Sequence, residues 1–121
     1  LVITTAFHQK INDNQFELMD NTPSFLTEST TWADSVFKTL TPDERIAQLF
    51  MVAAYSNQGA SHVAKIEKLI AENKIGGLIF MQGGPLRQAA LINQYQQLSK
   101  VPLMVSIDGE WGLAMRLDSV V

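Results

Sequence analysis

The stretch GGLIFMQGGPLRQAALINQYQQLSKVPLMVSI, residues 76–107, contains two short apolar runs with a longer mixed segment between them. LIFMQ follows two glycines, and VPLMVSI opens near Pro102, where a missing N–H does least harm to a strand. The segment between them begins GGP, and a proline suits the first turn of a helix. Its expected buried face consists of Leu86, Ala90, Leu91, Tyr95 and Leu98. This stretch therefore predicts a strand, a helix and a second strand.

The residues before this stretch repeat the same order. LFMVAAYS, residues 49–56, is apolar without alternation, which predicts a strand buried on both faces. GASHVAKIEKLIAENKIGG, residues 59–77, predicts a helix that Ser61 caps. The apolar stripe of this helix is Val63, Ile66, Leu69 and Ile70. Upstream, TTWADSVFKTL has helical spacing, and TPDERIAQLF combines Thr41 as N-cap with Glu44 in a capping box.

The expected order is therefore β-α-β-α-β with short connections, which predicts an α/β fold with parallel strands and right-handed crossovers. Two architectures use this order, an open doubly wound sheet and a closed (β/α)₈ barrel. A complete barrel needs about 250 residues, and this chain has 121. Residues 1–30 are rich in Asn, Asp, Ser and Thr, so we expect an irregular N-terminal arm there and the α/β part over residues 31–121.

Composition narrows the classes of function. A net charge of −3 gives no basic surface for nucleic acid. The chain has no cysteine, which excludes a disulfide and a thiolate nucleophile. No apolar run reaches the roughly 18 residues of a membrane helix. His8 and His62 stand alone, without metal-ligand spacing, so neither a metal nor a cofactor is expected.

Polar side chains follow all three predicted strands, in AYSN, FMQGG and IDGEWG. Because the carboxyl ends of parallel strands meet at one edge, we expect these groups to line one crevice. The expected lining is Tyr55, Asn57, Gln82, Asp108, Glu110 and Trp111. Polar acceptors beside an aromatic face suit a sugar, whose hydroxyls need hydrogen-bond partners and whose ring carbons stack on an indole.

The sequence also raises other interpretations of these residues, of which we reject the first. Asp108 and Glu110 could form a glycosidase acid/base pair, but neighbours at one strand end can hardly approach a glycosidic bond from opposite sides. Asp108 could instead cap the next turn, with Glu110 solvated. The turn at Gly83 and Gly84 could hold a nucleotide or phosphate, which would make the chain a small non-catalytic binding module. Arg116 either pairs with Asp118 or reaches back into the crevice.

The segments KIGGLIFMQGG, RQAALINQYQQLS and PLMVSIDGEWGLAMRLDS together resemble the N-terminal catalytic domain of glycoside hydrolase family 3. The likeness covers about residues 32–119 and is greatest for its β-N-acetylhexosaminidase-type members from Bacteroidetes-like bacteria. Residues 107–117 match the family pattern Asp-x-Glu-Gly-Gly, with an arginine a few residues on. Trp111 and Leu113 depart from it, standing where many members have Gly and Arg.

The resemblance implies a (β/α)₈ barrel that hydrolyses β-linked sugars with retention. It implies that Asp108 binds hydroxyls of the sugar rather than acting as nucleophile, and that Arg116 supports the site. The family's nucleophile and its KHFPGHG-like acid/base loop have no match in these 121 residues. We therefore expect an inactive fragment of a longer enzyme that self-associates through open sheet edges. Relatives of this kind are often exported to the periplasm or cell envelope.

Overall fold

The computed structural model describes residues 23–118, and the chain divides into two compact units, residues 1–30 and 31–121. In the first unit the described residues contain one short helix, α1 (Ser24–Thr27). Most of the predicted irregular arm, residues 1–22, lies outside the described residues. The elements of the second unit are α2 (Thr31–Thr39), α3 (Pro42–Ala47), β1 (Met51–Tyr55), α4 (Ala60–Ala71), β2 (Gly77–Gln82), α5 (Pro85–Leu98), β3 (Met104–Ile107) and the 3₁₀ helix η1 (Leu113–Met115).

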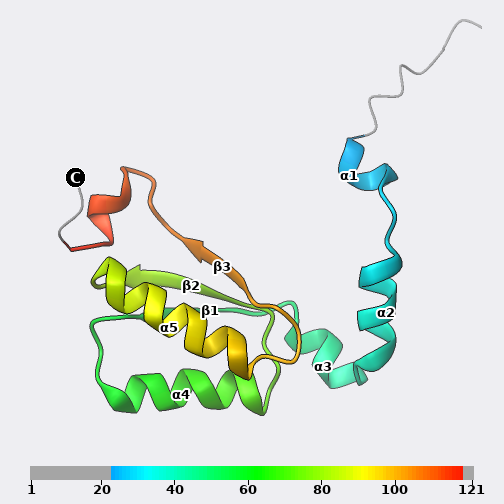
Figure 1. Ribbon diagram of the computed structural model, residues 1–121, viewed down its shortest axis with the longest axis horizontal. Coiled ribbons are helices and arrows are strands. Elements are labelled where there is room, and N and C mark those ends of the chain that lie inside the picture. Colours follow the sequence, from blue (N-terminus) through cyan, green and yellow to red (C-terminus); the bar gives the residue numbers. More distant parts are fainter. Residues whose placement is uncertain (1–22, 119–121) are drawn as a thin grey trace, which may run out of the picture. The chain divides into compact units, whose positions relative to one another are not determined.

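The three strands form one parallel sheet in the order β1-β2-β3 (Figure 1). Gly77 of β2 pairs with Met51 on one side and with Met104 on the other, so the strands start in register. A helix connects each strand to the next, as the alternating pattern predicts. The α/β class and the β-α-β-α-β order are therefore confirmed.

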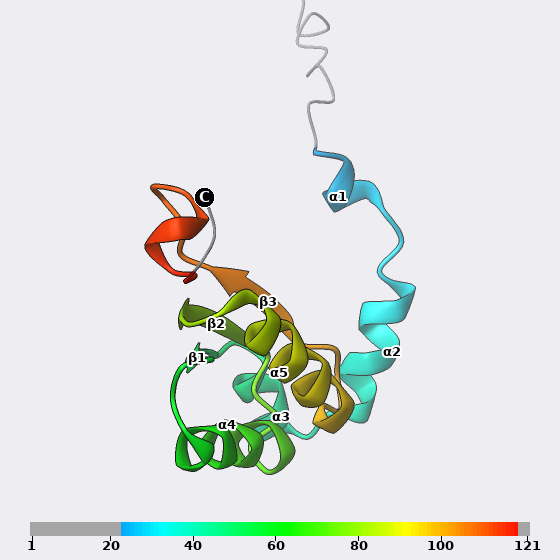
Figure 2. The same cartoon turned by 60° about the vertical axis from the view of Figure 1, so that its left-hand side comes forward.

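One apolar core lies between the sheet and the helices α4 and α5, which run side by side under the same face (Figures 1 and 2). The sheet contributes Ala54, Leu78 and Phe80, all fully buried. Ile66 and Ile70 of α4 meet them, so the stripe predicted for this helix does face the core. From α5 the main contribution is Tyr95.

The opposite face of the sheet is largely uncovered by the described residues. Met51 and Ala53 of β1 are exposed, and Met104 of β3 is 69% exposed. The prediction that residues 49–56 are buried on both faces is therefore wrong. The apolar run reflects two different surroundings, because Val52 and Ala54 face the helices while the alternate residues face outward.

Helix α5 faces the core with a different side from the one its leucines predict. Leu91 and Tyr95 point inward as expected, but Leu86 is 86% exposed, and Ala90 and Leu98 are also exposed. Gln96 explains the orientation, because its amide donates to the Leu103 carbonyl and accepts from the Leu103 N–H, at 2.8 and 2.9 Å. These two hydrogen bonds to the chain before β3 fix the rotation of α5.

Helix caps and a close backbone contact define the segments on either side of β1. The capping box of α3 is present, with the Thr41 hydroxyl accepting from the Glu44 N–H and Glu44 accepting from the Thr41 N–H. Helix α4 starts at Gly59 without a side-chain cap, so the prediction that Ser61 caps it is wrong. Gly76 passes so close to Gln48 that a Cβ there would lie 1.9 Å from the Gln48 carbonyl oxygen.

No helix within residues 23–118 has both the length and the apolar character needed to cross a membrane.

The one-sided core leads to a stability prediction. Leu78→Ala should lower the free energy of unfolding by about 2–5 kcal/mol, because it leaves a cavity beneath the central strand. Leu86→Ala removes the same atoms from an exposed position and should change stability by less than about 0.5 kcal/mol. Urea unfolding followed by circular dichroism measures both. Equal losses in the two variants would show that α5 is rotated differently.

Candidate functional site

The carboxyl ends of the three strands meet at one edge of the sheet. Tyr55 at the end of β1 pairs with Gln82 at the end of β2, after an irregularity between Ala54 and Tyr55. Ile107 at the end of β3 pairs with Phe80, so Asp108 leaves the sheet at the same edge. The structure thus brings together the strand ends that the sequence predicted to share a crevice.

Asp108 is held by Arg116 from the loop that follows. The guanidinium Nε donates to the Asp108 carbonyl oxygen and Nη2 donates to its Oδ2, both at 2.7 Å. The Arg116 side chain is only 18% exposed, whereas that of Asp108 is 39% exposed. Among residues 23–118, Oδ1 has no hydrogen-bond partner, so this oxygen is oriented and still open. Arg116 therefore pairs with Asp108 rather than with Asp118.

The loop after β3 is fixed to the end of β2 by its backbone. The Gly83 N–H donates to the Arg116 carbonyl at 3.1 Å, and the Asp118 N–H donates to the Gly83 carbonyl at 2.9 Å. These bonds form a short parallel bridge between Gly83 and Leu117. Arg116 is thus positioned both by its side-chain bonds to Asp108 and by the backbone bonds to Gly83. These bonds hold the loop against the end of β2.

The turn after β1 is joined to the same place. The Ser56 N–H donates to the Gln82 carbonyl at 2.9 Å, and the buried Ser56 hydroxyl donates to the Gly84 carbonyl at 3.3 Å. Arg87 of α5 donates from Nε to the Ser56 carbonyl at 3.2 Å. Gly83 has a φ of +134°, and a Cβ there would lie 2.0 Å from the Ser56 oxygen, so only glycine fits.

His62 of α4 completes the end of β1. Its Nε2 accepts a hydrogen bond from the Tyr55 N–H at 3.1 Å, and the two rings meet edge to face at 5.5 Å. This bond requires a neutral imidazole with an unprotonated Nε2. Burial, and then the charge of Lys65, hold the pKa of His62 below its ordinary value of 6.5. His62 therefore supports the end of β1. Within residues 23–118, no group of three or more His, Cys, Asp or Glu side chains is placed to hold a metal ion.

The remaining predicted residues border this edge on its solvent side. Gln82, Asn57 and Glu110 are exposed. Trp111 is 87% exposed, and its backbone N–H donates to the Met115 sulfur at 3.3 Å. Its indole is accordingly available to a ligand. No hydrogen bond or ion pair joins these four side chains to one another, so Asp108 and Arg116 are the part of the predicted set that is joined directly.

The sequence missed three residues that build the edge, namely Ser56, His62 and Arg87. Ser56 is the last residue of the first predicted strand, and this position was the available signal. His62 and Arg87 lie on helices, and their partners are backbone groups of another segment. Such partners leave no spacing pattern in the sequence.

The glycine turn offers little to an anion. The Gly83 N–H is already bonded to the Arg116 carbonyl, and Pro85 at the start of α5 has no N–H. Arg87 lies over Gly84, but its guanidinium also faces Asp118 at 3.9 Å on the exposed surface. The geometry therefore gives a phosphate fewer donors than the open glycine-rich turn that the sequence suggested.

In comparisons with known proteins, no family model and no curated protein matches this chain. The function is therefore argued from the geometry of the strand ends.

The bond between His62 and Tyr55 predicts a pH dependence of stability. Because the folded pKa lies below the unfolded one, the unfolded state takes up the proton first. The contribution of His62 is fully present above its unfolded pKa, about 6.5, and is lost as the pH falls through the folded pKa. His62→Gln should therefore show less loss of stability than the parent chain between about pH 7 and pH 5. Urea unfolding at each pH measures this, and parallel curves for the two proteins would contradict it.

Proposed function

We propose that residues 31–118 are a sector of a (β/α)₈ barrel from a retaining glycoside hydrolase resembling family 3. In this proposal, Asp108 binds a hydroxyl of a β-linked sugar. Terminal β-N-acetylhexosaminides and β-glucosides are the proposed substrates of the parent enzyme. The observation that carries the proposal is the Asp108 carboxylate, whose Oδ2 is held by Arg116 while the side chain remains 39% exposed.

The sheet supports a barrel sector. Its strands follow one another in sequence order, and both crossover helices cover one face. In a barrel the other face would be the interior, filled by side chains from all strands. The outward-facing Met51, Ala53 and Met104 suit that position, since they are apolar and exposed here. In an open doubly wound sheet, helices would have to cover this second face.

The chemistry of the strand ends supports a sugar ligand. A carboxylate oxygen makes stronger hydrogen bonds to hydroxyl donors than a neutral oxygen does. A fixed carboxylate loses little conformational freedom when the sugar binds, because Arg116 already orders it. Trp111 offers an exposed indole three residues away, and sugar ring carbons pack well on such a face. Gln82 adds an exposed amide at the end of the neighbouring strand.

In this proposal, the chain binds the sugar but does not cleave the glycosidic bond. Asp108 carries no general acid/base role in it, because Oδ2 is already engaged by Arg116. Glu110 lies on the same loop as Asp108, and retaining hydrolysis needs two carboxyl groups about 5–5.5 Å apart on opposite sides of the glycosidic bond. The family's nucleophile and acid/base loop have no counterpart in these 121 residues. We therefore propose that cleavage needs groups this sequence does not supply.

Replacing the carboxylate tests the proposal. Asp108→Ala should abolish binding of N-acetylglucosamine, because it removes the charged acceptor, while Asp118→Ala should retain it. Asp118 is a matched control, since its carboxylate is exposed on the same loop and faces Arg87 at 3.9 Å. Ligand-observed NMR with the sugar measures both variants, with AMP as a second ligand. Binding of AMP but not of the sugar would favour the nucleotide-binding alternative and contradict this proposal.

The indole supplies an independent signal. The chain has two tryptophans, Trp32 and Trp111, so Trp32→Phe leaves Trp111 as the only indole. In that background N-acetylglucosamine should change the fluorescence of Trp111, because the ring passes from water to a sugar face. Trp111→Ala should weaken binding about tenfold with little change in stability, as the side chain is exposed. Unchanged fluorescence at saturating sugar would rule out stacking.

A further inference from the structure

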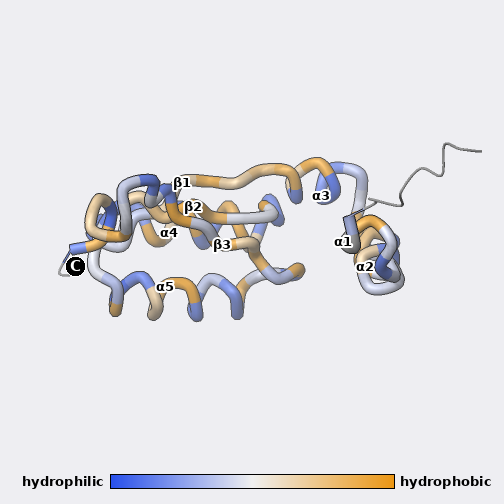
Figure 3. The backbone as a smooth tube through the Cα atoms, turned by 90° about the horizontal axis from the view of Figure 1, so that it is seen from above, coloured by the Kyte–Doolittle hydropathy of each residue, from blue (hydrophilic) through white to orange (hydrophobic). Residues whose placement is uncertain are grey.

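His62 joins the first turn of α4 to the end of β1, at the edge of the sheet that carries the proposed sugar site. Its Nε2 accepts from the Tyr55 N–H at 3.1 Å, and the two rings meet edge to face. Figure 3 shows apolar colouring along the chain from α3 into β1, and the hydrophilic residues Ser56, Asn57 and Gln58 follow the strand. A titratable side chain is therefore bonded to the backbone where the buried strand ends.

This bond exists in only one protonation state of His62. An imidazolium carries N–H groups on both ring nitrogens, so its Nε2 cannot accept from the Tyr55 N–H. The titratable groups that face the ring are Lys65 on the same helix and Tyr55 on β1, and neither offsets a positive charge. Among residues 23–118, no carboxylate lies within ion-pair distance of His62. A proton on His62 therefore places two N–H donors against each other, and the contact has to open.

Opening at Tyr55 reaches the turn after β2 through the next residue. The Ser56 N–H donates to the Gln82 carbonyl at 2.9 Å, and the Ser56 hydroxyl donates to the Gly84 carbonyl at 3.3 Å. The Ser56 carbonyl in turn accepts from Nε of Arg87 at 3.2 Å. Movement of the end of β1 therefore disturbs three bonds that hold the neighbouring turn.

That turn is bonded to the loop beside the proposed sugar-binding carboxylate. The Gly83 N–H donates to the Arg116 carbonyl at 3.1 Å, and the Arg116 guanidinium holds Asp108 by two bonds of 2.7 Å. His62 and Asp108 thus lie at the two ends of one continuous series of hydrogen bonds. The neutral and protonated forms of His62 give this series two discrete states, which coupling between two sites requires.

We propose that His62 is an acid-sensitive positioning residue for the sugar site, whose protonation releases the end of β1 and weakens sugar binding. This inference rests on the proposed function, since it concerns regulation of the same site. In the released form the ring is in water, where its pKa is about 6.5. Burial, and then Lys65, lower the pKa of His62 in the bonded form, so the released form takes up the proton first as the pH falls. By reciprocity, a sugar that binds only the bonded form makes protonation of His62 harder.

An NMR titration of the full chain tests the coupling to the sugar. His8→Gln leaves His62 as the only imidazole, so its ring signals report one pH midpoint. N-acetylglucosamine at ten times its dissociation constant should lower that midpoint by about one pH unit, because binding to the bonded form competes with the proton. Sugar that binds without moving the midpoint would overturn the proposal.

Hydrogen exchange tests the opening without any ligand. Between pH 7 and pH 5, protection of the Tyr55 amide should fall by up to about 25-fold relative to His62→Gln, the ratio that a pKa of 6.5 in the released form allows. His62→Gln is the matched variant, because its amide oxygen accepts a hydrogen bond but does not titrate. Equal protection of Tyr55 in the two proteins at both pH values would overturn the proposal.

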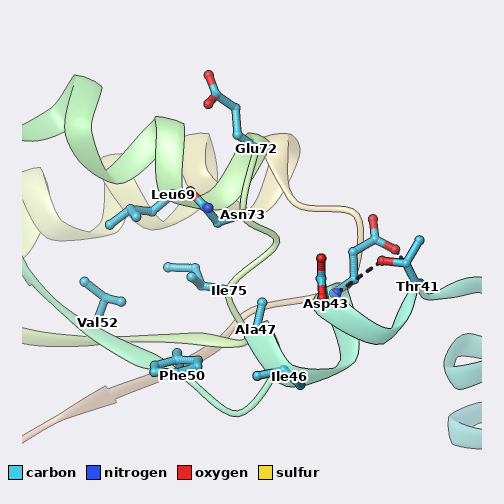
Figure 4. A pocket seen from close by; sticks show the side chains of 11 residues that line it. Thr41, Asp43, Ile46, Ala47, Phe50, Val52, Leu69, Glu72, Asn73 and Ile75 are labelled. Carbon is cyan, nitrogen blue, oxygen red and sulfur yellow. Dashed lines mark hydrogen bonds between the residues drawn. The ribbon is translucent and has the colours of Figure 1, made fainter.

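The opposite end of the sheet supplies an internal control. There the Gly77 N–H donates to the Phe50 carbonyl at 3.1 Å, beside a pocket that Phe50 and Ile75 line (Figure 4). Protection of the Gly77 amide should be the same in both proteins at each pH, and a parallel loss there would show global unfolding and overturn a local switch. If the sugar bound at no pH, the proposed function would fall, while exchange at Tyr55 would still decide whether protonation opens the strand end.

Discussion

The parallel pairing of β2 with both neighbouring strands is the constraint on which the core and the candidate site depend. It aligns Gly77 with Met51 and Met104, and so brings the three carboxyl ends to one edge. Because β2 is central, its helix-facing side chains Leu78 and Phe80 are fully buried. Gly83 follows this strand directly, and its backbone fixes the loop that carries Arg116. Packing and site geometry therefore share one origin.

The two ends of the sheet have different physical characters. At the carboxyl end, backbone bonds and the ion pair of Arg116 with Asp108 fix polar groups in place. At the other end, Phe50 and Ile46 present apolar surface beside carboxylates. The two ends of the sheet therefore present different surfaces, one polar and held by hydrogen bonds, the other largely apolar.

Sequence pattern predicted the order of elements because local signals agree with the tertiary structure. The capping box at Thr41 and the stripe around Ile66 are local, and both are confirmed. The rotation of α5 was missed because Gln96 is turned inward by the backbone of Leu103, a contact that no helical period encodes. The bare face of β1 was missed because an apolar run does not reveal whether a second layer is present. The strand ends were foreseen by topology, whereas the roles of His62 and Arg87 depend on three-dimensional contacts.

The claim that the carboxyl ends of the strands form a sugar site is tested most directly by mapping where the sugar binds. Amide chemical shifts of the ¹⁵N-labelled chain, followed during titration with N-acetylglucosamine, report on each residue separately. We predict that the largest changes fall on Gly83, Gly109 and Trp111, around the open oxygen of Asp108. Changes confined to residues at the opposite end of the sheet, such as Phe50 and Ile75, would contradict the account, as would no change at saturating sugar.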